Sequence, residues 1–129
     1  MPGNFQNLLA LFAEDTKVVN LEPGQELFKK GDSGRDMYVI LSGELEVADG
    51  NHIFATVGAG EIVGEMALVS NEPRSATVRA ISAAAVTPVD ERRFLFLIQH
   101  APFFAVSVMQ TLSARLKLMN AWVTSPDRK

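Results

Sequence analysis

The sequence predicts a mainly β fold with helices at its ends. Eight of the nine glycines fall between Gly24 and Gly64, in turn-like contexts such as Pro23-Gly24 and Asp49-Gly50. Short segments with strand character lie between them, and many short strands with a turn about every eight to twelve residues are typical of a small barrel or sandwich. Both ends of the chain instead carry apolar residues at helical spacing. We therefore expect one β domain flanked by helices.

The predicted strands are short runs bounded by glycine turns. Glycine tolerates positive φ, so each of these turns can reverse the chain. Glu44-Leu45-Glu46-Val47 alternates polar and apolar side chains, as a half-exposed strand does. The predicted strands are Lys17–Leu21, Glu26–Lys29, Met37–Ser42, Glu44–Ala48, His52–Val57, Thr77–Ala80 and Ala84–Val89.

The chain ends are predicted to be helical. Residues 4–14 form an amphipathic pattern, and Asp90 is a suitable N-cap for a helix over 91–98. A further helix begins near Ala101-Pro102, where proline is tolerated in the first turn. Its apolar residues keep a spacing of three and four; they are Ala105, Val108, Met109, Leu112, Leu116, Met119 and Val123.

Leu118 and Trp122 add a second apolar edge to this last helix. A helix that is apolar on two sides needs two partners, here its own barrel and another subunit. We therefore expect a homodimer through the C-terminal helix. The whole of 1–129 is predicted to be a single domain, with an N-terminal helix in 1–15, the β region in 16–90, the C-terminal helices in 91–123 and a polar tail in 124–129.

Composition excludes several classes of function. The 129-residue chain has no cysteine, a net charge of −3 and no basic run longer than two residues. It therefore has no disulfide or thiolate chemistry and is poorly built for direct nucleic-acid binding. His52 and His100 are isolated, so we predict no metal site and no metal-dependent hydrolysis. No apolar run reaches the roughly 18 residues of a membrane span, and a cytoplasmic location is expected.

Residues 60–80 carry the chemistry. Arg74 follows Pro73 and offers a planar fork of donors for phosphate oxygens, with the Ser75 hydroxyl beside it. Gly64 lets the backbone approach a ligand closely, and Glu65 can accept a hydrogen bond from a sugar hydroxyl. A short helical turn over 65–70 would point its first N–H groups at an anion. This combination suits a small anionic sugar phosphate.

The sequence Gly64-Glu65-Met66-Ala67-Leu68, followed after four residues by Pro73-Arg74-Ser75-Ala76-Thr77, resembles the phosphate-binding cassette of cyclic-nucleotide-binding domains. These domains occur in the bacterial catabolite activator, protein kinase A regulatory subunits and cyclic-nucleotide-gated channels. Residues 31–47, which run from Gly31-Asp32-Ser33-Gly34 to Glu44-Leu45-Glu46-Val47, resemble the strand–turn–strand signature of the same family. The resemblance covers residues 15–123, with the cassette at 64–77.

The resemblance implies an eight-stranded β-roll (a double-stranded β-helix, jelly-roll-like) that holds a cyclic nucleotide. By position, Arg74 binds the cyclic phosphate and Glu65 the ribose 2′-hydroxyl. The last helix would close over the base through Met119, Asn120 or Trp122. The ligand-binding set implied in this way is Gly64, Glu65, Met66, Ala67, Arg74, Ser75, Ala76, Asn120 and Trp122, with no catalytic residue.

Several alternatives stay open at this point. Glu65 and Arg74 could form an ordinary ion pair at a turn, and Ser75 could bond to local backbone. Trp122 could stack on the purine or fill a dimer interface, and Asn120 could read the base or face water. Serine at position 75 is the residue found in the catabolite activator, which favours cyclic AMP over cyclic GMP.

The leading hypothesis is a non-enzymatic sensor that binds a cyclic purine mononucleotide and signals to a protein effector, with no cofactor. The alternative is a transcription regulator of the catabolite-activator class that lacks, or is separated from, its DNA-binding domain. A degenerate roll that serves only for interaction is a third candidate, against which the intact cassette argues.

Overall fold

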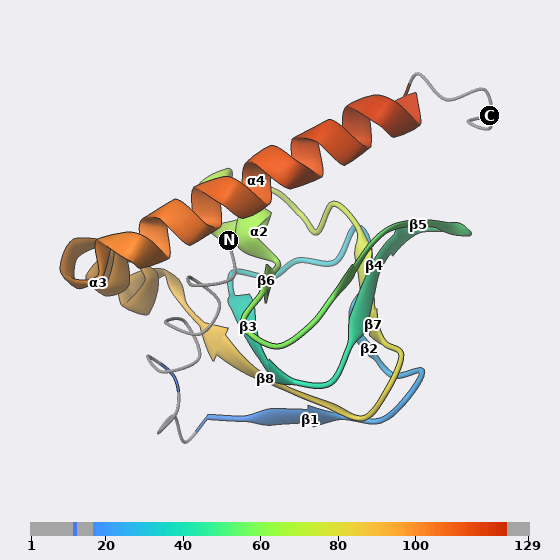
Figure 1. Cartoon of the computed structure of the whole chain (residues 1–129), viewed down its shortest axis with the longest axis horizontal. Helices are drawn as coiled ribbons and strands as arrows, with labels where there is room; N and C mark the ends of the chain where they lie inside the picture. Colours follow the sequence, from blue (N-terminus) through green and yellow to red (C-terminus); the bar gives the residue numbers. More distant parts are fainter. Residues whose placement is uncertain (1–11, 13–16, 124–129) are drawn as a thin grey trace.

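The computed structural model describes residue 12 and residues 17–123, without the side chains of 119, 122 and 123. Its eight strands form two four-stranded antiparallel sheets, in the orders β1-β8-β3-β6 and β2-β7-β4-β5 (Figure 1). The strands are β1 (Val19–Leu21), β2 (Glu26–Phe28), β3 (Met37–Ser42), β4 (Leu45–Asp49), β5 (His52–Val57), β6 (Ile62–Val63), β7 (Thr77–Ala80) and β8 (Ala84–Val89). The helices are α2 (Glu65–Val69), α3 (Glu91–His100) and α4 (Pro102–Val123). The eight-stranded roll expected from the resemblance is confirmed.

The predicted strands agree with the observed ones to within two residues at each end. β6 was not among them. It has only two residues, Ile62 and Val63, which pair with Val39 and Tyr38 of β3. Two residues are too few for alternation to show, so this strand depends on its partner and not on a pattern of its own.

In the sheet β1-β8-β3-β6, strands β3 and β8 have buried residues on both faces, and this decides where the helices lie. Ile40 and Val86 belong to the core between the two sheets. Val39 and Val89 belong to a second core, which includes Leu97 and Phe104 of the helices. Alternate residues of a strand face opposite sides of its sheet, so β3 contributes to both cores. The helices therefore pack on the outer face of this sheet.

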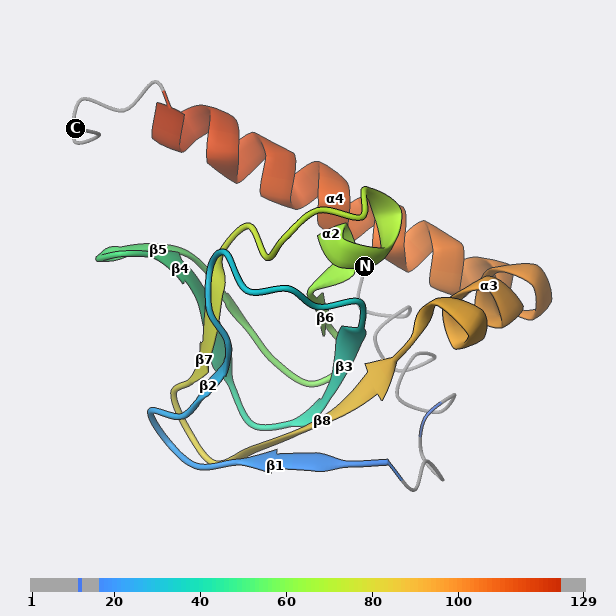
Figure 2. The same ribbon diagram turned by 180° about the vertical axis from the view of Figure 1, so that it is seen from behind.

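α3 and α4 begin where the sequence predicts. The Asp90 carboxylate accepts a hydrogen bond of 2.8 Å from the backbone N–H of Arg93, which is the N-cap interaction expected for α3. α4 then crosses the open end of the roll, with α2 beneath its middle, in both views (Figures 1 and 2). Val108 in its first half is buried against the second core. α4 is therefore placed as a cover over the roll.

The predicted N-terminal helix over 4–14 and the tail at 124–129 lie outside the described residues. Phe12 alone of that region is described; it is buried, and its ring centroid lies 6.5 Å from that of Phe104. Among the described residues, no single helix is long and apolar enough to cross a membrane. α3 with the first part of α4 meets the criterion only as a pair, bent by 115°.

Candidate functional site

The site begins at a left-handed residue. Gly64 has φ 77° and ψ 11° and immediately precedes α2. A Cβ at this position would lie 2.8 Å from Nη1 of Arg74 and 3.2 Å from the carbonyl oxygen of Asp36. Both the backbone conformation and the lack of space therefore require glycine. The close approach expected at Gly64 is made, in this structure, by the Arg74 side chain.

Arg74 is a buried cation. The residue is 6% exposed, and its Cζ lies 4.1 Å from the centroid of the Phe28 ring and 5.9 Å from that of Tyr38. Nη1 donates a long hydrogen bond of 3.3 Å to the carbonyl oxygen of Gly64, whereas the buried Nε has no partner among the described residues. The alternative of an ordinary turn ion pair with Glu65 is not what the structure shows, because Glu65 pairs elsewhere.

Burial is the main influence on the pKa values of Arg74 and its neighbour Tyr38. It lowers the pKa of the Arg74 guanidinium, an effect that Tyr38, Asp36, Asp32 and Glu65 oppose. Burial also raises the pKa of the Tyr38 hydroxyl; Asp36 adds to this, and Arg74 acts against it. An arginine pKa starts so high that Arg74 remains charged near neutral pH. The site therefore presents a permanent positive charge.

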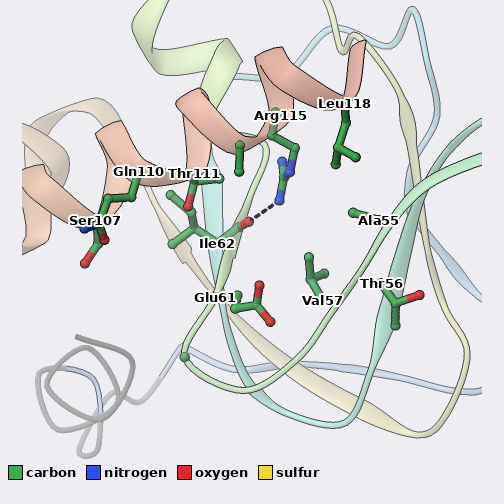
Figure 3. Close-up of a pocket in the computed structure, with 12 residues that line it drawn as sticks. Ala55, Thr56, Val57, Glu61, Ile62, Ser107, Gln110, Thr111, Arg115 and Leu118 are labelled. Atoms are coloured by element: carbon green, nitrogen blue, oxygen red, sulfur yellow. Dashed lines mark hydrogen bonds between the residues drawn. The ribbon is translucent and has the colours of Figure 1, made fainter. Parts of the chain in front are cut away.

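Glu65 is fully buried at the start of α2 and pairs with Arg115 of α4. Nη1 of Arg115 donates to both carboxylate oxygens, at 3.0 and 3.3 Å. Nη2 donates to the carbonyl oxygen of Ile62 at 2.9 Å, the contact drawn as a dashed line in Figure 3. Arg115 therefore ties the covering helix to both β6 and α2.

Arg115 is the residue that the sequence reasoning missed. Arg115 and Lys117 are the only charged residues between Pro102 and Val123. Arg115 follows Val108 and Leu112 at helical spacing, so it lies on the face of α4 that packs on the roll. A cation on an otherwise apolar, buried helix face was the available signal, because such a charge needs a partner.

Most of the predicted ligand-binding residues line two adjoining cavities. A small one of about 30 Å³ is lined by residues of the cassette together with Phe28, Val47, Val78 and Arg115. A larger one of about 400 Å³ is mainly apolar and lies between the roll, α2 and α4. The residues that line both cavities are Val47, Glu65, Met66, Ser75, Ala76 and Arg115. All seven predicted cassette residues line the small cavity: Gly64, Glu65, Met66, Ala67, Arg74, Ser75 and Ala76.

The two remaining predicted residues are not brought to these cavities by the described structure. Asn120 is exposed on α4 and lines neither cavity, and the side chain of Trp122 lies outside the described residues. The residues of α4 that reach the larger cavity are Leu112, Arg115 and Leu116, one to two turns earlier. In this structure α4 contacts the cavity through these residues.

Arg115 also borders a third cavity, of about 320 Å³, between β5 and α4 (Figure 3). This cavity contains none of the predicted ligand-binding residues. Within the described part of the chain, no group of three or more His, Asp or Glu side chains could hold a metal ion.

Comparison with known proteins identifies the family. The model of the cyclic nucleotide-binding domain matches residues 18–101. A cGMP-dependent protein kinase from Toxoplasma gondii is 34% identical over 94 residues, which are 70% of this chain and 10% of that protein. A cyclic nucleotide-gated potassium channel from Rhizobium etli is 35% identical over 92 residues, which are 71% of this chain and 26% of that protein. The chain therefore spans a minor part of these relatives.

Solved structures agree on the fold. PKAR CBD2 bound to Sp-2Cl-cAMPS superimposes with a TM-score of 0.75 at 19% identity, over 98% of this chain and 97% of that one. The catabolite activator protein of Thermus thermophilus gives a TM-score of 0.70 at 25% identity, over 93% of this chain and 57% of that one.

Proposed function

This chain belongs to the family of cyclic nucleotide-binding domains, and on that premise we propose that it is a non-enzymatic sensor of a purine 3′,5′-cyclic mononucleotide. Cyclic AMP is the preferred ligand over cyclic GMP. The observation that carries the proposal is the buried, permanently charged guanidinium of Arg74, whose Nε has no partner in the described part of the chain and which lines the same small cavity as the buried Glu65 carboxylate. The cyclic phosphate pairs with the Arg74 guanidinium, and the ribose hydroxyl donates to the Glu65 carboxylate.

The phosphate role of Arg74 rests on the cost of burying a charge. A buried guanidinium without a counterion is unfavourable, and Nε has no partner among the described residues. A cyclic phosphate monoanion supplies both the opposite charge and acceptor oxygens, in charge-assisted hydrogen bonds. Ser75 is exposed and lines both cavities, so its hydroxyl is available to the same group.

Glu65 keeps acceptor capacity for a sugar hydroxyl although it is paired. A carboxylate offers about four lone-pair sites, and Arg115 uses one on each oxygen. A ribose 2′-hydroxyl can therefore donate to Glu65 while the ion pair remains. A 2′-deoxy analogue would leave this acceptor buried and unused, which explains why a ribonucleotide is favoured.

The preference for adenine rests on the apolar character of the larger cavity. Its polar lining residues are Glu65, Ser75 and Arg115, and the rest of its lining is Val47, Phe54, Met66, Val69, Ala76, Leu112 and Leu116. Guanine carries more hydrogen-bonding groups than adenine, and polar groups without partners are costly to bury. We therefore assign cyclic AMP a modest advantage.

α4 is the proposed output element. Arg115 and Leu116 contact the ligand cavities, and Met109 and Leu116 are 59% and 62% exposed on the same helix. A ligand that moves Arg115 or Leu116 changes the surface offered to a second subunit or a protein effector. The nucleotide can shift the populations of two arrangements of α4 because it binds one of them more tightly than the other.

The similarity to the catabolite activator protein supports a second candidate function. In that case the domain works within a transcription regulator, and another domain or partner contacts DNA. Salt-sensitive retardation of genomic DNA fragments by this chain together with such a domain or partner, and none by the chain alone, would favour this candidate.

The test of the sensor function is isothermal titration calorimetry with cyclic AMP and cyclic GMP. Arg74→Ala should lose about 3–5 kcal/mol of binding free energy, because the phosphate is left buried without its partner. Arg79→Ala is the matched control: Arg79 pairs with Glu46 and lines none of the three cavities. Equal affinity of Arg74→Ala and the parent chain would refute the phosphate role.

A further inference from the structure

The segment between β2 and β3 holds the backbone at Arg74. The backbone N–H of Arg74 donates to the carbonyl oxygen of Asp32 at 2.9 Å, and that of Gly31 donates to the carbonyl oxygen of Arg74 at 2.8 Å. This pair of hydrogen bonds joins the end of the cassette to a loop far away in sequence. The Arg74 side chain therefore leaves the backbone at a point that the β2–β3 segment determines.

The end of β2 and the β2–β3 segment surround the guanidinium group. The Phe28 ring lies against it, with 4.1 Å between Cζ and the ring centroid. Gly34 lies so near that an added Cβ would be 2.6 Å from Nη2, 2.7 Å from Nε and 2.8 Å from Cζ. Real Cβ atoms do not approach so closely, so a methyl group and the guanidinium cannot occupy this space together.

Gly34 does not have a left-handed backbone. Its conformation is open to other residues, so glycine is not needed there for a turn. What requires glycine is the space taken by Arg74. Gly34 differs in this from Gly64, where both the left-handed backbone conformation and the lack of space require glycine.

We propose that Phe28 and Gly34 form a slot that fixes the pose of the Arg74 guanidinium and thereby sets the affinity for the cyclic phosphate. The inference rests on the proposed function and adds two positioning residues to it. A flat cation fits between a ring and a glycine, whereas the ammonium group of lysine gains less from such a site. A guanidinium that is ordered before the ligand arrives loses less side-chain freedom on binding.

The experiment is calorimetric titration of cyclic AMP into Gly34→Ala, Phe28→Leu and Gly58→Ala. Gly34→Ala should weaken binding about 10-fold or more, because the guanidinium is displaced from its pose. Phe28→Leu keeps an apolar side chain but removes the ring, and should weaken binding about 3- to 10-fold. Gly58→Ala is the control, since its Cβ would meet nothing nearer than 3.7 Å and its φ is not left-handed; affinity should stay within about twofold.

A double-mutant cycle distinguishes positioning from general damage. In an Arg74→Ala background, measured by competition at high cyclic AMP, Gly34→Ala should cause no further loss, because there is no guanidinium to displace. An equal loss in both backgrounds would overturn the slot, as would parental affinity of both Gly34→Ala and Phe28→Leu. Failure of the parent chain to bind any cyclic nucleotide would instead refute the proposed function itself.

Discussion

Arg115 is the residue whose role depends most on the folded structure. It lies 50 positions from Glu65, yet among the described residues it alone forms a salt bridge with that buried carboxylate. Removing one member of a buried pair leaves an uncompensated charge, whereas removing both members can be nearly neutral. The pair therefore links the stability of the domain to the chemistry of its site.

We predict that Arg115→Ala lowers the free energy of unfolding by about 3 kcal/mol, measured by urea denaturation. Adding Glu65→Gln to Arg115→Ala should recover part of this loss, because the unpaired buried charge is then gone. Lys117→Ala is the control: it removes an exposed cation from the same helix and should have little effect. If Arg115→Ala and Lys117→Ala prove equally stable, the Glu65–Arg115 pair does not stabilise the fold.

At the scale of elements, the turn between β3 and β4 is tightly restricted. Gly43 has φ 82°, and a Cβ there would collide with the carbonyl oxygen of Ala83 and with Ala84. Gly24, in the turn between β1 and β2, has a similar φ of 87° but open space around it. A substitution at Gly24 therefore tests the energetic cost of a left-handed residue alone, whereas one at Gly43 adds the cost of a steric collision.

We predict that Gly24→Ala destabilises the protein by about 1–2 kcal/mol, the cost of placing a side chain in a left-handed conformation. Gly43→Ala should cost a further ~1–3 kcal/mol, because the backbone between β7 and β8 must move. Urea denaturation of both variants gives the comparison. Similar losses of unfolding free energy for the two variants would mean that the β7–β8 turn can move away from the new Cβ at little cost.

For the whole molecule, the question is what covers the apolar residues of α4 that are exposed. Ala105, Met109, Leu112 and Leu116 follow one another by four, three and four positions, the spacing of a two-helix seam. Met109 and Leu116 are exposed, while Leu112 and Leu116 also line the ligand cavity. The proposed dimer seam and the proposed ligand site therefore meet on one helix.

We predict that Met109→Glu shifts the protein toward monomer in sedimentation analysis, because it places a charge in the seam. Cyclic AMP should change the dimerisation constant of the parent chain, because Leu116 belongs to both the seam and the cavity; dimerisation then changes the affinity for cyclic AMP by the same factor. Ile81→Glu, a change of an exposed apolar residue between β7 and β8, should leave the mass distribution unchanged. A parent chain that is monomeric at every concentration, with and without cyclic AMP, would refute the dimer.

Much of the fold could be predicted because its signals are local. Turns marked by glycine, the Asp90 cap and the start of α4 each depend on a few neighbouring residues. The two-residue strand β6 could not be predicted, since it exists only through its pairing with β3. The contacts of Arg74 with Phe28 and Gly34 were equally hidden, because they join segments that the sheet order brings together.

The amino-acid sequence by itself determined the cassette. Gly64, Glu65, Arg74 and Ser75 lie within one short stretch, so the chain has little freedom to separate them, and all four line one cavity. Only the tertiary structure decided which part of α4 meets that cavity, and it places Arg115 there rather than Asn120. The physical reason is that a helix repeats every 3.6 residues, so spacing identifies a face, whereas the position along that face is decided by packing against the roll.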